Sequence, residues 1–158
     1  MHKKGQAAME FLMTYGWAIL AAIIVIAVLA VYFKPSALQT SNAIVTAPFY
    51  ANAWNVVSGT GVSIEVRNQA GEEVTVTDVT VSGTGASSGT DCSWDESGGS
   101  QIVSAGDLQL FVLDTDIALG SCAFAAGDSY TGDILITYTK GGGTTELSST
   151  GSITSTAT

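Results

Sequence analysis

The feature that most constrains this chain is an uncharged apolar run near its N-terminus. Residues 11–33 contain no Asp, Glu, Lys or Arg. At about 1.5 Å of rise per residue, a helix of this length crosses the roughly 30 Å hydrocarbon core of a bilayer. His2, Lys3 and Lys4 precede the run and would stay cytoplasmic, whereas the residues after Lys34 are mostly polar, small or acidic. The sequence therefore predicts a membrane-spanning helix with most of the chain outside the cell.

The two edges of the apolar run narrow its interpretation. A cleaved secretory signal has a shorter apolar region followed by an Ala-x-Ala-like site, whereas this run continues into KPSALQT without one. A plain signal anchor is the alternative. Glu10 stands at the threshold of the run, and a carboxylate at the mouth of a membrane helix is costly unless it is paired. Glu10 is therefore a candidate functional residue.

The residues around Glu10 form a specific pattern. The segment KGQAAMEF, residues 4–11, resembles the class III signal peptide of archaeal type IV pilin-like proteins, and residues 12–20 continue that pattern. In that family a membrane aspartyl peptidase cuts after the glycine, on the cytoplasmic side of the apolar segment. The resemblance implies that a prepilin peptidase cleaves between Gly5 and Gln6 and leaves the apolar helix in the mature subunit.

Cleavage at this position has a physical consequence for the helix. It removes Lys3 and Lys4, which hold the N-terminus on the cytoplasmic side, and frees the helix to move from lipid into a bundle of identical helices. There the new amine of Gln6 would be a buried positive charge, and Glu10 could neutralise it within one subunit or between neighbours. The alternative is that Glu10 only favours the positive end of the helix dipole, worth about 0.3–1 kcal/mol.

Small residues interrupt the large ones along the apolar run. Ala18 and Ala22 are four residues apart, and Gly16 precedes them. This spacing lets helices approach closely in an apolar medium, although alanine is also common in helices generally. The sequence therefore predicts a packing face at Gly16, Ala18 and Ala22. The resemblance implies that the partners are further copies of the chain in a helical homopolymer and a pilus assembly platform in the membrane.

Charge and residue content restrict the function of the remainder. The chain has fourteen acidic residues against five basic ones, for a net charge of −9. Nucleic-acid binding needs clustered Lys or Arg, so it is not expected. His2, the single histidine, lies in the segment that cleavage removes, which leaves no Ser/His/Asp or Cys/His nucleophile. We expect no enzyme activity, no catalytic residues, no cofactor and no transition-metal site.

Two cysteines fall in the part placed outside the cell. Outside the cytoplasm a lone pair is most simply a disulfide, so Cys92 and Cys122 are predicted to be bonded to each other. Trp94, close to Cys92, is predicted to pack on that disulfide, with stacking on a sugar as the alternative. Asp91, Asp95 and Glu96, together with Asp114 and Asp116, form acidic loops that could bind calcium, with a solvated acidic surface as the alternative.

The residues after the helix have the pattern of β-structure. Val62, Ile64 and Val66 alternate with polar neighbours, a turn follows at residues 68–71, and Val74 and Val76 resume the alternation, which predicts a hairpin. The alternation then slips by one residue, which predicts a bulge near Asp78. The fold class expected is α+β, with a long hydrophobic N-terminal helix followed by an all-β immunoglobulin-like sandwich head.

Four segments are predicted. Residues 1–5 are a cleaved leader, 6–34 a membrane and filament-core helix, 35–57 a connector, and 58–158 an extracellular β-sandwich head. Phe49, Tyr50 and Trp54 in the connector are expected to pack under the sandwich, with ligand stacking by Trp54 as an alternative.

The resemblance implies a structural subunit of an archaeal type IV pilus-like filament. The precursor would lie in the cell membrane and the product in a surface filament that supports adhesion. One alternative is a minor or non-assembling pilin-like protein, anchored in the membrane, whose head is a receptor or adhesin. A second alternative is a simple membrane-anchored surface protein with an uncleaved helix.

Overall fold

The computed structural model describes residues 3–32, 40–94, 99–114 and 122–158. The chain divides into two compact units, Met1–Leu38 and Gln39–Thr158. The first contains one helix and the second contains the strands, in agreement with the expected order of an apolar helix followed by a β-domain.

The helix α1 spans Lys3–Tyr32. It includes the whole described part of the predicted apolar run and extends toward the N-terminus through Gly5 and Gln6, so the backbone is already helical at the proposed cleavage site. The predicted end of the helix at Lys34, before Pro35, lies outside the described residues.

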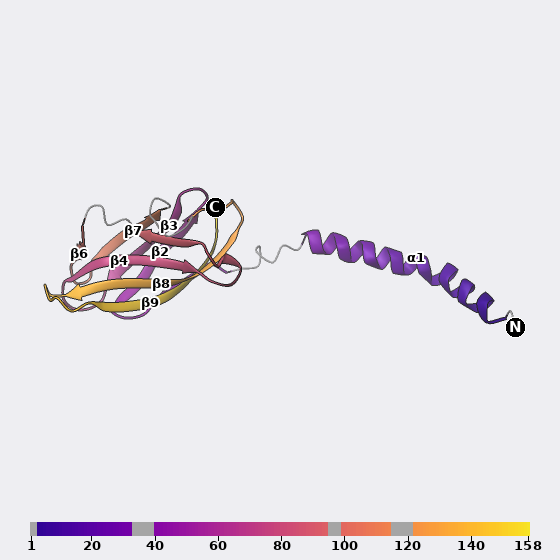
Figure 1. Cartoon of the computed structure of the whole chain (residues 1–158), viewed down its shortest axis with the longest axis horizontal. Helices are drawn as coiled ribbons and strands as arrows, with labels where there is room; N and C mark the ends of the chain where they lie inside the picture. The colour runs from indigo at the N-terminus through magenta and orange to yellow at the C-terminus, as the bar shows by residue number, and fades with distance from the viewer. Residues whose placement is uncertain (1–2, 33–39, 95–98, 115–121) are drawn as a thin grey trace. The chain divides into compact units, whose positions relative to one another are not determined.

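The β-domain contains nine strands within the described residues, together with the short 3₁₀ helix η2 (Figure 1). Their bounds are β1 (Asn42–Val45), β2 (Phe49–Val57), β3 (Gly61–Asn68), β4 (Val74–Gly83), η2 (Gly85–Ser87), β5 (Asp91–Trp94), β6 (Gln101–Val103), β7 (Leu108–Asp114), β8 (Ser129–Lys140) and β9 (Leu147–Thr156).

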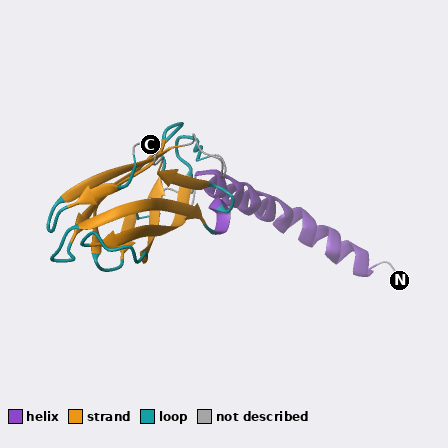
Figure 2. Ribbon diagram, turned by 60° about the vertical axis from the view of Figure 1, so that its left-hand side comes forward, coloured by secondary structure: helices purple, strands orange, loops and turns teal. Residues whose placement is uncertain are grey.

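All of these strands belong to one antiparallel sheet. Its order is β1-β9-β8-β4-β5-β7-β3-β2, and β6 pairs with β4 beside this path. The strand β5 joins the two halves, and it pairs with β7 through two residues, Ser93 with Asp114 and Trp94 with Leu113. At the other end of the path, the Thr158 N–H donates to the Val56 carbonyl at 3.0 Å, which ties the chain after β9 to β2. Figure 2 shows the strands curving around a common interior.

The structure therefore confirms a β-domain after an apolar helix but does not confirm an immunoglobulin-like sandwich. A sandwich has two separate sheets packed face to face, whereas here the described strands form one continuous hydrogen-bonded path. The alternation of buried and exposed residues is common to both arrangements, because either one buries a single face of each strand. The pattern in the sequence could not separate the two.

The predicted connector, residues 35–57, needs correction. Residues 42–45 and 49–57 are the strands β1 and β2, so the β-domain begins well before residue 58. Phe49 is buried and Trp54 packs against the core, as expected, but Tyr50 is exposed. The alternation of β2 explains the error, because Tyr50 follows Phe49 directly and therefore points to the opposite face of the sheet.

The predicted hairpin of residues 62–66 with 74–76 is also wrong. The strand β3 pairs with β2 and β7, and β4 pairs with β8, β5 and β6. The turn that follows β3 therefore carries the chain to another part of the sheet. The predicted bulge near Asp78 is confirmed, because the register of β4 against β8 shifts between Val76 and Asp78.

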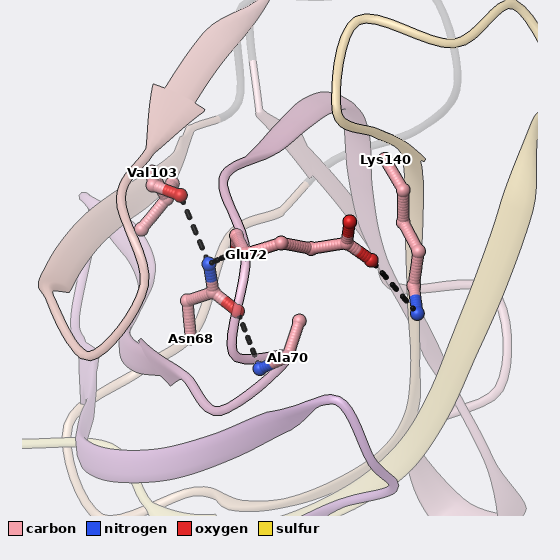
Figure 3. A network of polar contacts seen from close by, with 5 residues as sticks. All are labelled: Asn68, Ala70, Glu72, Val103 and Lys140. Carbon is pink, nitrogen blue, oxygen red and sulfur yellow. Dashed lines mark hydrogen bonds and ion pairs between the residues drawn. The ribbon is translucent and has the colours of Figure 1, made fainter.

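Asn68 fixes the turn between β3 and β4 from inside the domain. Its side chain is fully buried, and its amide group donates to the carbonyls of Glu72 at 2.8 Å and Val103 at 2.9 Å. Its Oδ1 atom accepts from the Ala70 N–H at 2.8 Å (Figure 3). Asn68 thus links the end of β3, the following turn and β6, and it satisfies backbone groups that burial would otherwise leave unpaired.

The predicted disulfide between Cys92 and Cys122 is present. Both residues are buried, and the bond joins β5 to the segment before β8. Because β5 is the strand that connects the two halves of the sheet, the disulfide reinforces the part of the path with the fewest residue pairs.

Candidate functional site: the apolar helix and the surface of the β-domain

The helix α1 exposes nearly all of its apolar side chains. Residues Met13–Tyr32 have a mean hydropathy of 2.4, and none of this stretch is buried within the chain. The core helix of a soluble protein would instead be covered by its own fold. By length and composition this stretch can cross a membrane, so it indicates membrane association or secretion.

The predicted charge-pairing residues lie in the first turns of α1. Gln6 and Glu10 are four residues apart on a continuous helix, which places their backbone positions one above the other on one face. Glu10 is exposed, and Thr14 Oγ1 donates to its backbone carbonyl at 2.8 Å. Within the described residues the carboxylate of Glu10 has no ion-pair partner. Its pairing with the amine of Gln6 stays a prediction.

The predicted packing face lies further along α1. Ala18 and Ala22 are exposed one turn apart, and a Cβ added at Gly16 would meet nothing within 4 Å. Nothing in the described part of the chain therefore requires small residues at these positions. Close approach of a second helix would require them, and the packing face stays a prediction.

A shallow groove of about 410 Å³ lies beside Trp54 on the β-domain. It is lined by Ser41, Asn52, Ala53, Trp54, Asn55, Ser155, Thr156 and Thr158. The bulge of β2 against β3, between Ala51 and Ala53, is next to Trp54 in the chain. The lining combines one aromatic ring with amides and hydroxyls and contains no charged side chain, which suits a neutral ligand with hydroxyl groups.

A second hollow, also of about 410 Å³, lies near η2 and is lined in part by Phe124 and Tyr130. These two rings meet edge to face with centroids 4.7 Å apart. Tyr130 donates from its hydroxyl to the Thr90 carbonyl at 3.2 Å. Burial, and secondarily the negative charge of Asp91, raises the pKa of Tyr130, so the hydroxyl stays a proton donor. Tyr130 therefore connects Phe124 and Thr90 in the lining of the hollow.

The acidic residues considered for calcium are not gathered into a site by the described part of the chain. Among those residues there is no group of three His, Cys, Asp or Glu side chains that could hold a metal ion. Asp95, Glu96 and Asp116 lie outside the described residues. Trp94, predicted to pack on the disulfide, meets Phe111 edge to face with centroids 5.1 Å apart.

One surface was not singled out by the sequence. Leu108, Leu110 and Val112 all point outward on β7. The signal was available in the segment LQLFVLD, which has apolar residues on both alternating faces.

No family model matches the chain, and no curated protein matches it. The resemblance to pilin-like proteins therefore depends on residues 4–20 together with the order of helix and β-domain.

Proposed function

We propose that this protein is a structural subunit of an archaeal type IV pilus-like surface filament. The observation that carries the proposal is a helix that is apolar, exposed and uncharged after Glu10 and that begins with the segment KGQAAME, which resembles a prepilin peptidase site. A helix of this kind needs an apolar environment outside its own chain.

The proposed mechanism has three steps. The precursor inserts into the membrane through α1, with Lys3 and Lys4 on the cytoplasmic side. Prepilin peptidase then removes residues 1–5, and the assembly platform transfers the helix from lipid into a filament core made of identical helices. The β-domain covers this core and meets the surface to which the cell attaches. We also propose that the β-domain is an immunoglobulin-like head. Only two residue pairs join β5 to β7, so few hydrogen bonds would have to be absent for the sheet to become two separate sheets.

The first experiment is intact-mass analysis and N-terminal sequencing of protein sheared from producing cells, compared with the membrane fraction. We expect the sheared protein to begin at Gln6 and to sediment as filaments. A protein that begins at Met1 and occurs only in membranes would contradict the proposal and support a plain anchor.

Glu10 provides the second test. We expect Glu10→Ala to be cleaved normally but to give few filaments, because the amine of Gln6 would enter the helix bundle without its counter-charge. Glu10→Asp is the matched control, since it retains the carboxylate and should retain most assembly. If Glu10→Ala gave wild-type amounts of filament, the charge-pairing role would be contradicted, and Glu10 would only interact favourably with the positive end of the helix dipole.

The groove beside Trp54 favours a second candidate function, a pilin-like receptor or adhesin that stays in the membrane. Asn52, Asn55 and neighbouring hydroxyl groups surround the ring, which suits a neutral saccharide. This candidate predicts that Trp54→Ala abolishes adhesion while processing and the amount of surface protein stay unchanged. Filaments in the sheared fraction of wild-type cells would decide against it as the main function.

A further inference from the structure

The outward face of β7 is apolar along most of its length. Leu108, Leu110 and Val112 are 42%, 52% and 43% exposed, whereas Phe111 and Leu113, on the opposite face of the strand, are fully buried. The β-domain exposes other large apolar residues, such as Ile44 and Ile102, but β7 places three of them in a row on one face. This stripe is therefore a candidate contact surface.

The neighbouring strands add an aromatic ring and a cation to the stripe. In the register of the sheet, Leu108 lies opposite Arg67 on β3, and Arg67 lies opposite Tyr50 on β2. All three are exposed, and side chains directly opposite each other on one face have Cβ atoms about 4.5–5.5 Å apart. We call Tyr50, Arg67, Leu108, Leu110 and Val112 the β7 face. Tyrosine and arginine beside aliphatic side chains are typical of residues that dominate binding energy at interfaces.

Arg67 has no ion-pair partner within the described residues. Lys140, the other cation described in the β-domain, is 3.5 Å from Glu72. Glu65 lies two residues from Arg67 on the same face of β3, but it accepts a hydrogen bond from the Asn52 side chain. Arg67 and Glu65, which lies opposite Leu110, are thus the charged groups beside the exposed aliphatic side chains of β7. Glu65 is not within ion-pair distance of Arg67, so the guanidinium is available to an acidic group of another chain.

On the other half of the sheet, an acidic side chain lies beside exposed aliphatic side chains. Asp133 on β8 is exposed and lies two residues from Leu135, which is 40% exposed on the same face. Asp133 lies opposite Ser152 on β9, and Ser152 lies opposite Ile44 on β1. Ile44 is 58% exposed. We call Ile44, Asp133 and Leu135 the β8 face. Asp133 has no ion-pair partner in the described part of the chain.

We propose that the β7 face of one copy binds the β8 face of the next copy, with Arg67 paired to Asp133 and the aliphatic side chains packed around them. The charges are complementary, and both faces supply exposed apolar side chains. The partner is a second copy of this chain, because the β8 face offers on the same molecule an exposed acid for Arg67 and aliphatic groups that can pack against Leu108, Leu110 and Val112. This inference rests on the proposed filament function.

The geometry of such a contact has a defined outcome. The two faces lie on different halves of the sheet, so the contact joins unlike surfaces and leaves one of each free at the ends. A contact of this type builds rings or open filaments, whereas a contact between like surfaces closes as a dimer. The β-domains would then support the filament independently of the helix bundle. The contact also supplies an opposite-charge pair that offsets repulsion between acidic domains.

Charge exchange tests the pairing in the full chain. We expect Arg67→Glu and Asp133→Arg each to lower the yield of sheared filaments more than about tenfold, because like charges would meet in the contact. The double variant Arg67→Glu/Asp133→Arg should restore most of the yield. Glu146→Arg is the matched control, since it makes the same change in charge as Asp133→Arg at an exposed loop residue outside both faces. Non-reducing electrophoresis of each variant would check that Cys92 and Cys122 are still bonded.

Cysteine cross-linking gives a second readout. A chain carrying Arg67→Cys and Asp133→Cys should give, on mild oxidation of filaments, a ladder of covalent oligomers. The two single-cysteine variants should stay largely monomeric.

The outcomes are distinct. Wild-type filament yields from both single charge variants, or a cross-linked product that stops at dimer, would overturn the β7–β8 contact and leave the proposed function standing. If wild-type cells produce no filaments, the proposed function fails and the contact that rests on it fails with it.

Discussion

The helix α1 and the β-domain differ in the exposure of their apolar side chains. The β-domain encloses a core whose valine, isoleucine and aromatic side chains are almost fully buried, whereas α1 leaves equally large side chains exposed from Met9 to Tyr32. Burial of an aliphatic or aromatic side chain is worth about 1.5–3 kcal/mol. The β-domain obtains this stabilisation from its own chain, whereas α1 does not obtain it within the described residues. Under the proposed function, lipid or other helices supply it.

This contrast indicates where each unit is sensitive to mutation. A change in α1 should alter the location and assembly of the protein, and a change in the core should alter its stability. The β7 face differs from this core, because its apolar side chains are exposed as they are on α1.

The largest expected effect comes from charges placed on the helix. Ile24 and Val28 are exposed one turn apart, and each replacement by Asp at the centre of a membrane helix costs about 3–4 kcal/mol. We expect Ile24→Asp/Val28→Asp to disappear from the membrane fraction, measured by fractionation and immunoblotting. The control Ile24→Val/Val28→Ile keeps the composition and should insert normally. Membrane retention of the Asp variant would show that α1 is not the membrane-spanning element.

The disulfide gives the largest expected effect within the β-domain. Its cysteines are 30 residues apart, and opening a loop of that size should lower the free energy of unfolding by about 3–4 kcal/mol. We expect Cys92→Ala/Cys122→Ala to unfold at a lower denaturant concentration, measured by tryptophan fluorescence of detergent-solubilised protein. Reduced wild-type protein should behave similarly. Equal midpoints with and without the bond would mean that β5 is held in place without it.

Asn68 tests the polar part of the same core. Asn68→Ala removes the donor and acceptor groups that satisfy the backbone of Ala70, Glu72 and Val103, and each buried group left unpaired costs about 1–3 kcal/mol. We expect a loss in that range in the same unfolding experiment. Gln69→Ala, at the neighbouring exposed position, is the control and should change stability little. A neutral Asn68→Ala would mean that the turn does not depend on this side chain.

Asp78 gives the smallest expected effect. Burial raises its pKa above the ordinary value, against a weaker lowering by a hydrogen bond with the Val79 backbone. The folded protein therefore binds this proton more tightly than the unfolded chain does. The resulting stability is present in acid, below the unfolded pKa, and is lost as pH rises through the folded pKa. Asp78→Asn should accordingly raise Tm at pH 7 by about 1–3 °C.

The pH dependence of that difference is the measurement that decides. The gap in Tm between Asp78→Asn and wild type should shrink as the pH is lowered toward the ordinary aspartate pKa. Asp107→Asn, an exposed control, should show no such trend. A gap that grows in acid would reverse the sign of the shift assigned to Asp78.

Several features of the fold followed from local signals in the sequence. The apolar run predicted α1, the slip in alternation predicted the bulge at Asp78, and the isolated cysteine pair predicted the disulfide. Each of these signals lies within a short segment or depends on a single possible pairing. Residues 42–57 of the predicted connector form β1 and β2 instead, and Pro48 and several small residues interrupt the alternation that would have indicated these strands.

The pairing of strands could not be predicted from local signals in the sequence, because it depends on contacts between distant segments. Residues 62–66 and 74–76 read as a hairpin, yet β3 pairs with β2 and β7. Asn68 read as an ordinary turn residue, and its burial was not apparent until β6 was placed beside it. The residues of the β7 and β8 faces come from five strands, so the sequence alone could not bring them together.

The pairing of β1 with β9 determines when the β-domain can finish folding during synthesis. Asn42 lies opposite Thr154, so the strand nearest the helix has no partner until the last strand has been synthesised. The helix can enter the membrane as soon as it leaves the ribosome, whereas the β-domain must wait for pairings of large sequence separation. Export of an unfolded chain is compatible with this order. Under the proposed function, the domain completes its sheet on the far side of the membrane, where Cys92 and Cys122 can be oxidised.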